Sequence, residues 1–413
     1  MKIYIAGITG TGMGPLALMA AQAGVKVYGS DLQEGAVSEE LKKSGIEYQI
    51  GEQNGDFLQR VHEEVGLDWF VYTSSLPENH PELSLAKKLG LRISKRDELI
   101  ANLVESLNLK MVAIAGTHGK TTVTAMIVWS CKQLGIPVSY LVGSTLSFGE
   151  AGHYEPASKF FIYEADEYDR NFLQFRPWLA VISSVSYDHP DIYKTVQDYQ
   201  AAFEQFEEQS EQTIRNVAIE QAITLTGLAR RYDATLALMA VEKIIAVSGL
   251  TLGREEIIAV LNKFPGVKRR FEQITEGVFT DYAHHPEEIS ATVELALEEA
   301  RQLKKSGVVV VYEPHQNVRQ HELRDGYREA FIGVNKLFWL PTFLTREDPN
   351  LVVFEPADFI NSLRNASVGE SAEINDELAE RLKEARKNNY LIVLMSAGPA
   401  DAWLRKIFGE IER

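Results

Sequence analysis

The sequence predicts an α/β protein of three domains, each built around a mainly parallel sheet. Short apolar runs that are typical of buried strands alternate with helical patterns along the chain. Two of these runs end in glycine-rich turns that open helices. A length of 413 residues accommodates two or three domains of roughly 100 to 200 residues each. We expect the domains to span residues 1–109, 110–265 and 266–413.

The composition is that of an ordinary globular protein and excludes several classes of function. Hydrophobic residues make up 45% of the chain and charged residues 24%, and no apolar run approaches the ~20 residues that span a bilayer. The N-terminus is typical of a strand and lacks the features of a signal peptide, so we expect a cytoplasmic protein without a membrane partner. The net charge of -16 argues against nonspecific binding of nucleic acid. The single cysteine, Cys131, excludes an intrachain disulfide framework.

The first segment predicts a small doubly wound, Rossmann-like domain. Its expected strands include residues 3–5, 27–28 and 69–72. Glycines crowd the turn Gly7–Gly14 at the start of a helix, and Asp31 follows the second strand. This spacing mimics a dinucleotide fingerprint, in which glycines approach a pyrophosphate and an acid binds a ribose hydroxyl. A nucleotide-diphosphate group fits as well as NAD, and a purely structural glycine turn is the alternative. The hydroxyls of Thr73-Ser74-Ser75 follow a strand and are candidate ligand contacts.

The central segment is organised around a strand, a glycine loop and a helix, which predict a P-loop ATPase-like domain. The apolar run 111–115 leads into Gly116–Thr122, and a helical pattern follows. In such a loop the backbone amides converge, the helix N-terminus adds partial positive charge, and Lys120 adds a full charge, so phosphate is the natural ligand. Thr121 is then placed to ligate a magnesium ion shared with the phosphates. The loop is shorter than the common Walker pattern, and an ordinary strand-to-helix turn is the alternative.

Two further strands of the central segment end in polar residues. The run 160–163 leads into Glu164–Asp169, and the run 179–182 is followed by Asp188-His189. Carboxylates and an imidazole at the carboxyl edge of a sheet that carries a phosphate loop suit a magnesium-nucleotide site. A solvated acidic loop is the alternative, which is disfavoured because Glu164 follows directly from an apolar strand.

The third segment follows a helical region and predicts a second Rossmann-like domain. Its expected strands cover residues 308–311, 337–339 and 391–394. Polar groups stand at the expected strand ends, in Asp281–Pro286, Glu313–His315 and Ser396–Gly398. Adjacent residues of an extended strand point in opposite directions, so we do not expect His284 and His285 to bind one metal ion.

The motifs occur in a fixed order along nearly the whole chain: Gly7–Gly14, Ser74-Ser75, Gly116–Thr122, Glu164–Asp169, Asp188-His189, Arg269-Arg270-Phe271 and Asp281–Pro286. Through this series the chain resembles the Mur ligase family, the ATP-dependent amide-forming enzymes of peptidoglycan synthesis. It is most similar to the branch that joins L-alanine to UDP-N-acetylmuramate. The resemblance implies ATP and Mg²⁺ as cofactors and an acyl-phosphate intermediate. We expect a monomer or a weak homodimer.

The resemblance also implies the roles of individual residues. The UDP-sugar would contact Gly10, Thr11, Gly12, Met13, Asp31, Ser74 and Ser75. ATP would contact Gly116, Thr117, His118, Gly119, Lys120, Thr121, Thr122, Arg270 and Asp281. Magnesium would be held by Thr121, Glu164 and His189, and the acceptor by Tyr282, His285 and Arg319. The catalytic group would comprise Lys120, Glu164, His189 and Arg319.

Three stretches depart from the family pattern. The central domain is shortened after Gln209. The family's Gly-x-His-Asn motif, whose asparagine contacts adenine, is replaced by Ala229–Asp233, in which Tyr232 is an alternative stacking partner. In the acceptor stretch, one of two family arginines is kept as Arg319 and the other is replaced by Gln316.

These departures leave alternative functions open. The sequence Glu313-Pro314 together with Asn317 is closer to the murein-recycling ligase, which adds the whole L-Ala-γ-D-Glu-meso-diaminopimelate tripeptide. A nucleotide-binding protein that has lost ligation is the second alternative. An NAD-dependent oxidoreductase is the third, but it leaves the phosphate loop and the acidic cluster unexplained.

Overall fold

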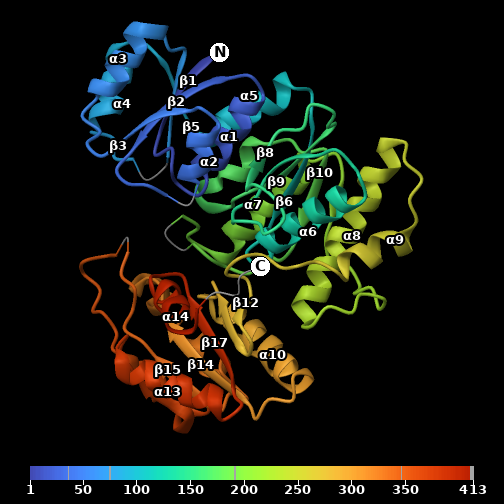
Figure 1. Ribbon diagram of the computed structural model, residues 1–413, viewed down its shortest axis with the longest axis vertical. Coiled ribbons are helices and arrows are strands. Elements are labelled where there is room, and N and C mark those ends of the chain that lie inside the picture. The colour runs from blue at the N-terminus through green and yellow to red at the C-terminus, as the bar shows by residue number, and fades with distance from the viewer. Residues whose placement is uncertain (36, 74–75, 190–191, 346, 410–413) are drawn as a thin grey trace. The chain divides into compact units, whose positions relative to one another are not determined.

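The computed structural model describes residues 1–35, 37–73, 76–189, 192–345 and 347–409 (Figure 1). The chain divides into two compact units. Unit 1 comprises Met1–Ala218 and Asp233–Phe264, and unit 2 comprises Ile219–Tyr232 and Pro265–Arg413. The described residues form three separate sheets, two in unit 1 and one in unit 2, which confirms the predicted α/β fold with parallel-sheet domains.

The first sheet has five parallel strands in the order β3-β2-β1-β4-β5. Its strands are β1 (Lys2–Ala6), β2 (Lys26–Asp31), β3 (Glu47–Ile50), β4 (Trp69–Tyr72) and β5 (Arg92–Lys95). Its helices are α1 (Met13–Gln22), α2 (Ser38–Lys43), α3 (Asp56–Val65), α4 (Pro81–Lys88) and α5 (Arg96–Ser106). The strand order reverses between β1 and β4, and ligands bind doubly wound sheets at such a switch point. The turn after β1 and the segment after β4 both begin there.

Apolar side chains on both faces of this sheet explain its helical layers. Leu58 of α3 and Leu83 of α4 pack with Phe70 on one face. On the other face, Leu16 of α1 and Leu99 of α5 belong to a core that continues into the central sheet. This shared core explains why the first two sheets form one compact unit.

The central sheet has six strands in the order β11-β10-β6-β9-β7-β8. They are β6 (Lys110–Ala115), β7 (Ser139–Leu141), β8 (Gly152–His153), β9 (Phe160–Glu164), β10 (Leu179–Ile182) and β11 (Thr213–Ile214). The accompanying helices are α6 (Lys120–Gln133), η1 (Tyr168–Gln174), α7 (Val196–Glu208), α8 (Leu228–Ser248) and α9 (Arg254–Leu261). β6 lies between β9 and β10 and runs parallel to both, so the residues that follow these three strands meet at one edge.

The third sheet has six strands in the order β12-β13-β17-β14-β15-β16, of which β12 alone is antiparallel to its neighbour. They are β12 (Glu272–Thr275), β13 (Val278–Asp281), β14 (Val308–Glu313), β15 (Lys336–Trp339), β16 (Gly369–Ser371) and β17 (Leu391–Ser396). Its helices are α10 (Pro286–Gln302), α11 (Asn317–Glu322), η2 (Arg324–Glu329), α12 (Pro356–Ile360), η3 (Ala366–Val368), α13 (Asp376–Lys387) and α14 (Ala400–Phe408).

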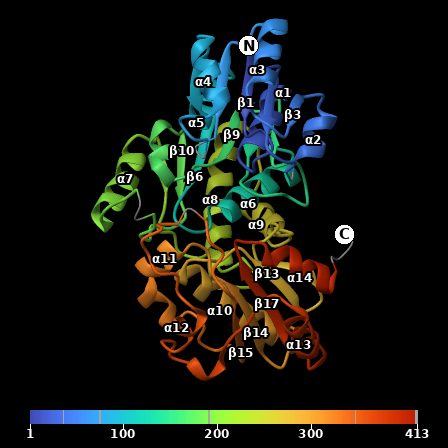
Figure 2. The same cartoon turned by 90° about the vertical axis from the view of Figure 1, so that its left-hand side faces the viewer.

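Two separate cores cover the faces of the third sheet. Leu382 of α13 and Leu404 of α14 pack on one face, whereas Val293 of α10 and Phe359 of α12 pack on the other. Figure 2 shows these helices on opposite sides of the sheet. The expected domain boundaries at residues 109 and 265 stay predictions. Among the described residues, no helix is long and apolar enough to cross a membrane.

Candidate active site

The glycine loop Gly116–Thr122, which is predicted to bind phosphate and is called the phosphate loop below, follows β6 and lies against the residues that follow β10. Gly116 has φ of 141°, and a Cβ at this position would collide with Oγ of Ser183 and lie 2.8 Å from the backbone of Ser184. Glycine is therefore required both by the backbone angle and by the close approach. The amide nitrogens of Thr117 and His118 donate to the backbone oxygen and Oγ of Ser184 at 3.1 and 2.8 Å. The loop is thus held in a defined conformation, and α6 begins directly after Gly119.

Lys120 forms a buried ion pair with Glu167. Its Nζ lies 2.7 and 3.0 Å from the two carboxylate oxygens and also donates to the backbone oxygen of Gly116 at 2.5 Å. Burial alone would lower the pKa of Lys120, but the charges of Glu167 and Asp166 outweigh it and raise the pKa above its ordinary value. The ammonium group is therefore kept charged in the phosphate loop.

Thr121 and Glu164 form a pair of oxygen donors beside the lysine. Oγ1 of Thr121 donates to Oε1 of Glu164 at 2.8 Å, and the amide of Gly143 donates to Oε2 at 2.9 Å. A hydroxyl and a carboxylate are ligands that Mg²⁺ prefers, so these two predicted magnesium ligands fit the ion. The parallel register of β6 and β9 explains why residues so far apart in sequence meet here.

His189 lies at the same edge, after β10. Its Nε2 is 3.6 Å from Oε1 of Glu167 and 3.8 Å from Oδ2 of Asp188. Its backbone has φ of 57°, a left-handed conformation that is uncommon for a residue other than glycine. Burial raises the pKa of neighbouring Asp166, as does the charge of Glu167, although Lys120 opposes the shift.

The contacts of Lys120, Thr121 and His189 with the acids at and after the end of β9 bring the predicted nucleotide and metal residues of the central sheet together.

The glycine turn of the first sheet is held by Asp31. Oδ2 of Asp31 accepts hydrogen bonds from N and Oγ1 of Thr9 at 2.9 and 2.7 Å, and Oδ1 accepts from the amide of Leu32. A Cβ on Gly12 would lie 2.6 Å from Nη1 of Arg96, so an arginine lies directly against the turn. The predicted contacts Ser74 and Ser75 lie outside the described residues.

A buried polar contact connects this turn to the central sheet. Arg96, at the start of α5, lies 3.3 Å from the hydroxyl of Tyr163 on β9, and that hydroxyl donates to Oδ1 of Asp97 at 3.0 Å. Tyr163 immediately precedes Glu164, so the glycine turn of the first sheet and the predicted magnesium ligand Glu164 are connected through this contact.

In unit 2, Asp281 ends β13 and orders the chain around it. Its two oxygens accept from the amides of Phe271 and Ala283 at 2.6 and 2.7 Å. Burial raises the pKa of Asp281 to about 6 despite the nearby charge of Arg270. The guanidinium groups of Arg269 and Arg270 lie 4.8 and 5.2 Å from the centre of the Tyr282 ring. Cation–π contacts of this kind fix the orientation of the ring.

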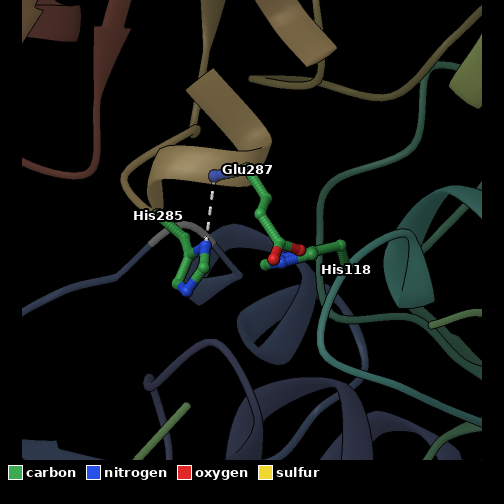
Figure 3. A group of neighbouring side chains, drawn as sticks. All are labelled: His118, His285 and Glu287. Carbon is green, nitrogen blue, oxygen red and sulfur yellow. Dashed lines mark hydrogen bonds between the residues drawn. The ribbon is translucent and has the colours of Figure 1, made fainter. Parts of the chain in front are cut away.

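His285 has a structural role in addition to its predicted role in acceptor binding. It is the N-cap of α10, and its Nδ1 accepts the amide of Glu287 at 3.2 Å (Figure 3). The carboxylate of Glu288 accepts the amide of His285 at 3.3 Å in return, which completes a capping box. One ring nitrogen is thus used to cap the helix.

Arg319 is buried in α11 beside a tightly anchored loop. Its Nη1 lies 3.4 Å from Nδ1 of His315. Asn317 accepts the amide of Phe354 at 3.2 Å and donates to the backbone oxygen of Val352 at 3.0 Å. Gln316, which replaces an arginine of the family pattern, has φ of 66° at the start of the helix. The predicted acceptor stretch is therefore bound to the segment that ends at Phe354.

The structure also identifies the neighbours of three acids that the sequence pattern placed only within a motif or at a strand end. Glu167 contacts Lys120, although it was one of several acids in the predicted cluster. Asp233 of α8 lies against the phosphate loop, since a Cβ on Gly119 would be 2.7 Å from its Oδ1. In unit 2, Glu313 is buried and accepts Oγ of Ser396 at 2.5 Å. The only sequence signal for these three was their position near a motif or at a strand end.

Comparisons with known proteins identify similar sequences along the chain. Residues 2–107 match the model described as "Mur ligase family, catalytic domain", and residues 114–230 match "Mur ligase middle domain". The UDP-N-acetylmuramate--L-alanine ligase of Syntrophomonas wolfei is 30% identical, over 97% of this chain and 95% of the relative. That alignment runs over 459 positions against a chain of 413 residues, so at least 46 of its positions are gaps in this chain.

Solved structures share the fold. The crystal structure of UDP-N-acetylmuramate-alanine ligase from Thermotoga maritima superimposes with a TM-score of 0.75 at 22% identity, covering 98% of both chains. A murein peptide ligase from Psychrobacter arcticus has a TM-score of 0.62 at 21% identity, again with 98% of both chains covered. At these identities the likeness shows a common fold over nearly the whole chain.

Proposed function

Because this chain belongs to the Mur ligase family, we propose that it is an ATP-dependent ligase that joins L-alanine to the carboxylate of UDP-N-acetylmuramate. The observation that carries the proposal is the cluster at one edge of the central sheet, where Lys120, Thr121 and Glu164 lie with His189. The curated relative from Syntrophomonas wolfei, which spans nearly the same length, bears the name of that activity. Formation of an amide from a carboxylate requires ATP, and the phosphate loop suits binding of the ATP phosphates.

In this proposal the phosphate loop binds the ATP phosphates. Lys120 supplies a full positive charge, and the backbone amides of the first turn of α6 supply hydrogen-bond donors. Thr121, Glu164 and His189 would hold Mg²⁺, which would supply charge neutralisation on the phosphate oxygens when bound.

The reaction has two steps. The carboxylate oxygen of UDP-N-acetylmuramate attacks the γ-phosphorus of ATP, the bond to the β-phosphate oxygen breaks, and ADP leaves. The amine of L-alanine then attacks the carbonyl carbon of the acyl phosphate, loses a proton, and expels inorganic phosphate. Lys120 and the loop amides stabilise negative charge that develops on the transferring oxygens, because fixed donors in a site with little water are effective stabilisers.

The other predicted contacts belong to the same proposal. Gly10 to Met13 and Asp31 bind the UDP-sugar, and Tyr282, His285 and Arg319 bind the acceptor. Arg270 and Asp281 contribute to ATP binding. We further propose that the protein acts in the cytoplasm as a monomer or weak homodimer.

The test is phosphate release from magnesium ATP with UDP-N-acetylmuramate, compared among L-alanine, the L-Ala-γ-D-Glu-meso-diaminopimelate tripeptide and no acceptor. Release that depends on L-alanine supports the proposal and shows that Gln316 is tolerated in the acceptor stretch. Release only with the tripeptide would assign the protein to the recycling activity, which Asn317 favours by resemblance. Nucleotide binding without release in either case would indicate a protein that has lost ligation.

A further inference from the structure

The Lys120 ammonium, which the proposed function assigns to phosphate binding, is already paired with the Glu167 carboxylate in this structure. A lysine ammonium has three hydrogen-bond donors. In the structure its partners are the two oxygens of Glu167 at 3.0 and 2.7 Å and the backbone oxygens of Gly116 at 2.5 Å and Thr117 at 3.5 Å. The Lys120 side chain is 15% exposed and that of Glu167 is 1% exposed, so water screens the pair little. A phosphate oxygen can reach this ammonium only if one partner moves away.

Glu167 is the partner that can move. The oxygen of Gly116 belongs to a backbone that is packed against Ser183 and Ser184. The Glu167 carboxylate, in contrast, ends a side chain with rotatable bonds and has a second polar neighbour, since Nε2 of His189 is 3.6 Å from Oε1. Its main chain is held separately, because the Tyr193 hydroxyl donates to the Glu167 backbone oxygen at 2.6 Å. A side-chain movement alone would therefore release the lysine.

Two other acids of the same run, Glu164 and Asp169, have different hydrogen-bond partners. Glu164 accepts from Thr121, and Asp169 pairs with Lys95 at 2.8 Å. Direct contact with the loop lysine thus distinguishes Glu167 from these two neighbours of equal charge.

We propose that Glu167 is an affinity-determining residue of the nucleotide site, whose carboxylate competes with the nucleotide phosphates for Lys120. This inference rests on the proposed function, because it takes the phosphate loop to bind ATP. Each binding event breaks the ion pair with Glu167, and each release of nucleotide allows it to re-form. Removal of the charge of Glu167 therefore makes nucleotide binding tighter, whereas loss of a merely structural residue makes it weaker.

The test is the affinity of a fluorescent ATP analogue, mant-ATP, for the full chain in the presence of EDTA. Without divalent cations, the measurement separates the competition for Lys120 from any role of the acidic side chains in metal binding. For Glu167→Gln we expect a dissociation constant roughly tenfold lower than that of the wild type, which corresponds to about 1.4 kcal/mol. Asp169→Asn is the matched control, since it removes the same charge two residues away, and we expect its dissociation constant to be unchanged.

Thermal unfolding verifies that each variant is folded. Glu167→Asp serves as a second variant, because it keeps the charge but withdraws the carboxylate from Lys120, and we expect an intermediate gain in affinity. An unchanged or higher dissociation constant for folded Glu167→Gln overturns the competition, as does an equal gain in Asp169→Asn. Absence of nucleotide binding by the wild type would instead overturn the proposed function, and the competition with it.

Discussion

Oγ1 of Thr121 donates a hydrogen bond of 2.8 Å to Oε1 of Glu164, which joins the first turn of α6 to the end of β9. The two residues meet because β6 and β9 are parallel neighbours and each is followed at the same sheet edge by a polar residue. The second oxygen of Glu164 is held by the amide of Gly143 at 2.9 Å. The fold therefore holds the Thr121 hydroxyl and the Glu164 carboxylate together as oxygen donors that suit a hard cation.

Two substitutions of Thr121 should distinguish the effect of its hydroxyl from the effect of its side-chain shape. Thr121→Val keeps the branched side chain but removes the oxygen, and we expect the magnesium concentration for half-maximal phosphate release to rise roughly tenfold or more. Thr121→Ser keeps the hydroxyl and should remain close to the wild type. The measurement is a magnesium titration of ATP-dependent phosphate release. Equal behaviour of the two variants would contradict a ligand role for the hydroxyl.

Substitution of Lys120 should affect catalysis and stability together. Lys120→Ala removes the phosphate-binding charge, so we expect ATP turnover to be lost while the UDP-sugar still binds, as measured by calorimetry. It also leaves the buried Glu167 charge without this partner, which should lower the free energy of unfolding by about 3–5 kcal/mol.

The double variant Lys120→Ala with Glu167→Gln should recover part of that stability but no turnover. Lys132→Ala is the control, because this exposed lysine lies on the same helix and donates to the backbone oxygen of Phe148. A double variant no more stable than Lys120→Ala would contradict the assignment of the loss to an uncompensated Glu167.

Asp281 should make stability depend on pH. Burial raises its pKa from 3.8 to about 6 in the folded protein, so the folded state holds this proton more tightly than the unfolded state. As the pH rises from about 4 to 6, the unfolded chain loses the proton first, and the folded protein loses stability relative to it. The shift corresponds to about 3 kcal/mol, lost progressively across this window.

Denaturant unfolding of wild type and Asp281→Asn between pH 4 and pH 7 would measure this contribution. The variant loses one of two accepted hydrogen bonds, which is a constant offset, so the pH dependence of the difference is the informative quantity. We expect the wild type to lose stability relative to the variant as pH rises. A difference that stays constant with pH would show that the folded pKa is not raised.

Asp233 places a negative charge against the phosphate loop at Gly119. Because a carboxylate repels phosphate, we expect Asp233→Asn to lower the dissociation constant of mant-ATP several-fold. Glu242→Gln is the control on the same helix, since Glu242 pairs with Arg254 at 2.5 Å. Weaker binding by Asp233→Asn would indicate instead that the carboxylate itself contacts the nucleotide.

Asn317 should influence the acceptor without influencing ATP. Asn317→Ala removes the side chain that holds Val352 and Phe354 and leaves their polar backbone atoms without it, which we expect to cost about 1–3 kcal/mol of stability. The looser segment should raise the KM for the acceptor severalfold and leave the dissociation constant of mant-ATP unchanged. Steady-state kinetics with varied acceptor measures the effect, and an equal change in both constants would contradict it.

The sequence by itself determined the fold class, the family and the positions of the main motifs. The alternation of apolar strands with helical patterns depends on local periodicity, and a loop such as Gly116–Thr122 carries its chemistry within a few consecutive residues. The structure confirms the parallel sheets, and the near-full-length similarity confirms the family. The roles assigned to individual site residues stay predictions.

Only the tertiary structure decided which charged groups are partners. Glu164, Asp166, Glu167 and Asp169 are equivalent acids in a linear pattern, and the packing of β6 between β9 and β10 decides that Glu167 contacts Lys120 while Asp169 contacts Lys95. Such pairings depend on the register of strands that are distant in sequence and on side-chain direction. The burial of the Lys120–Glu167 pair arises only when those strands and their helices pack together.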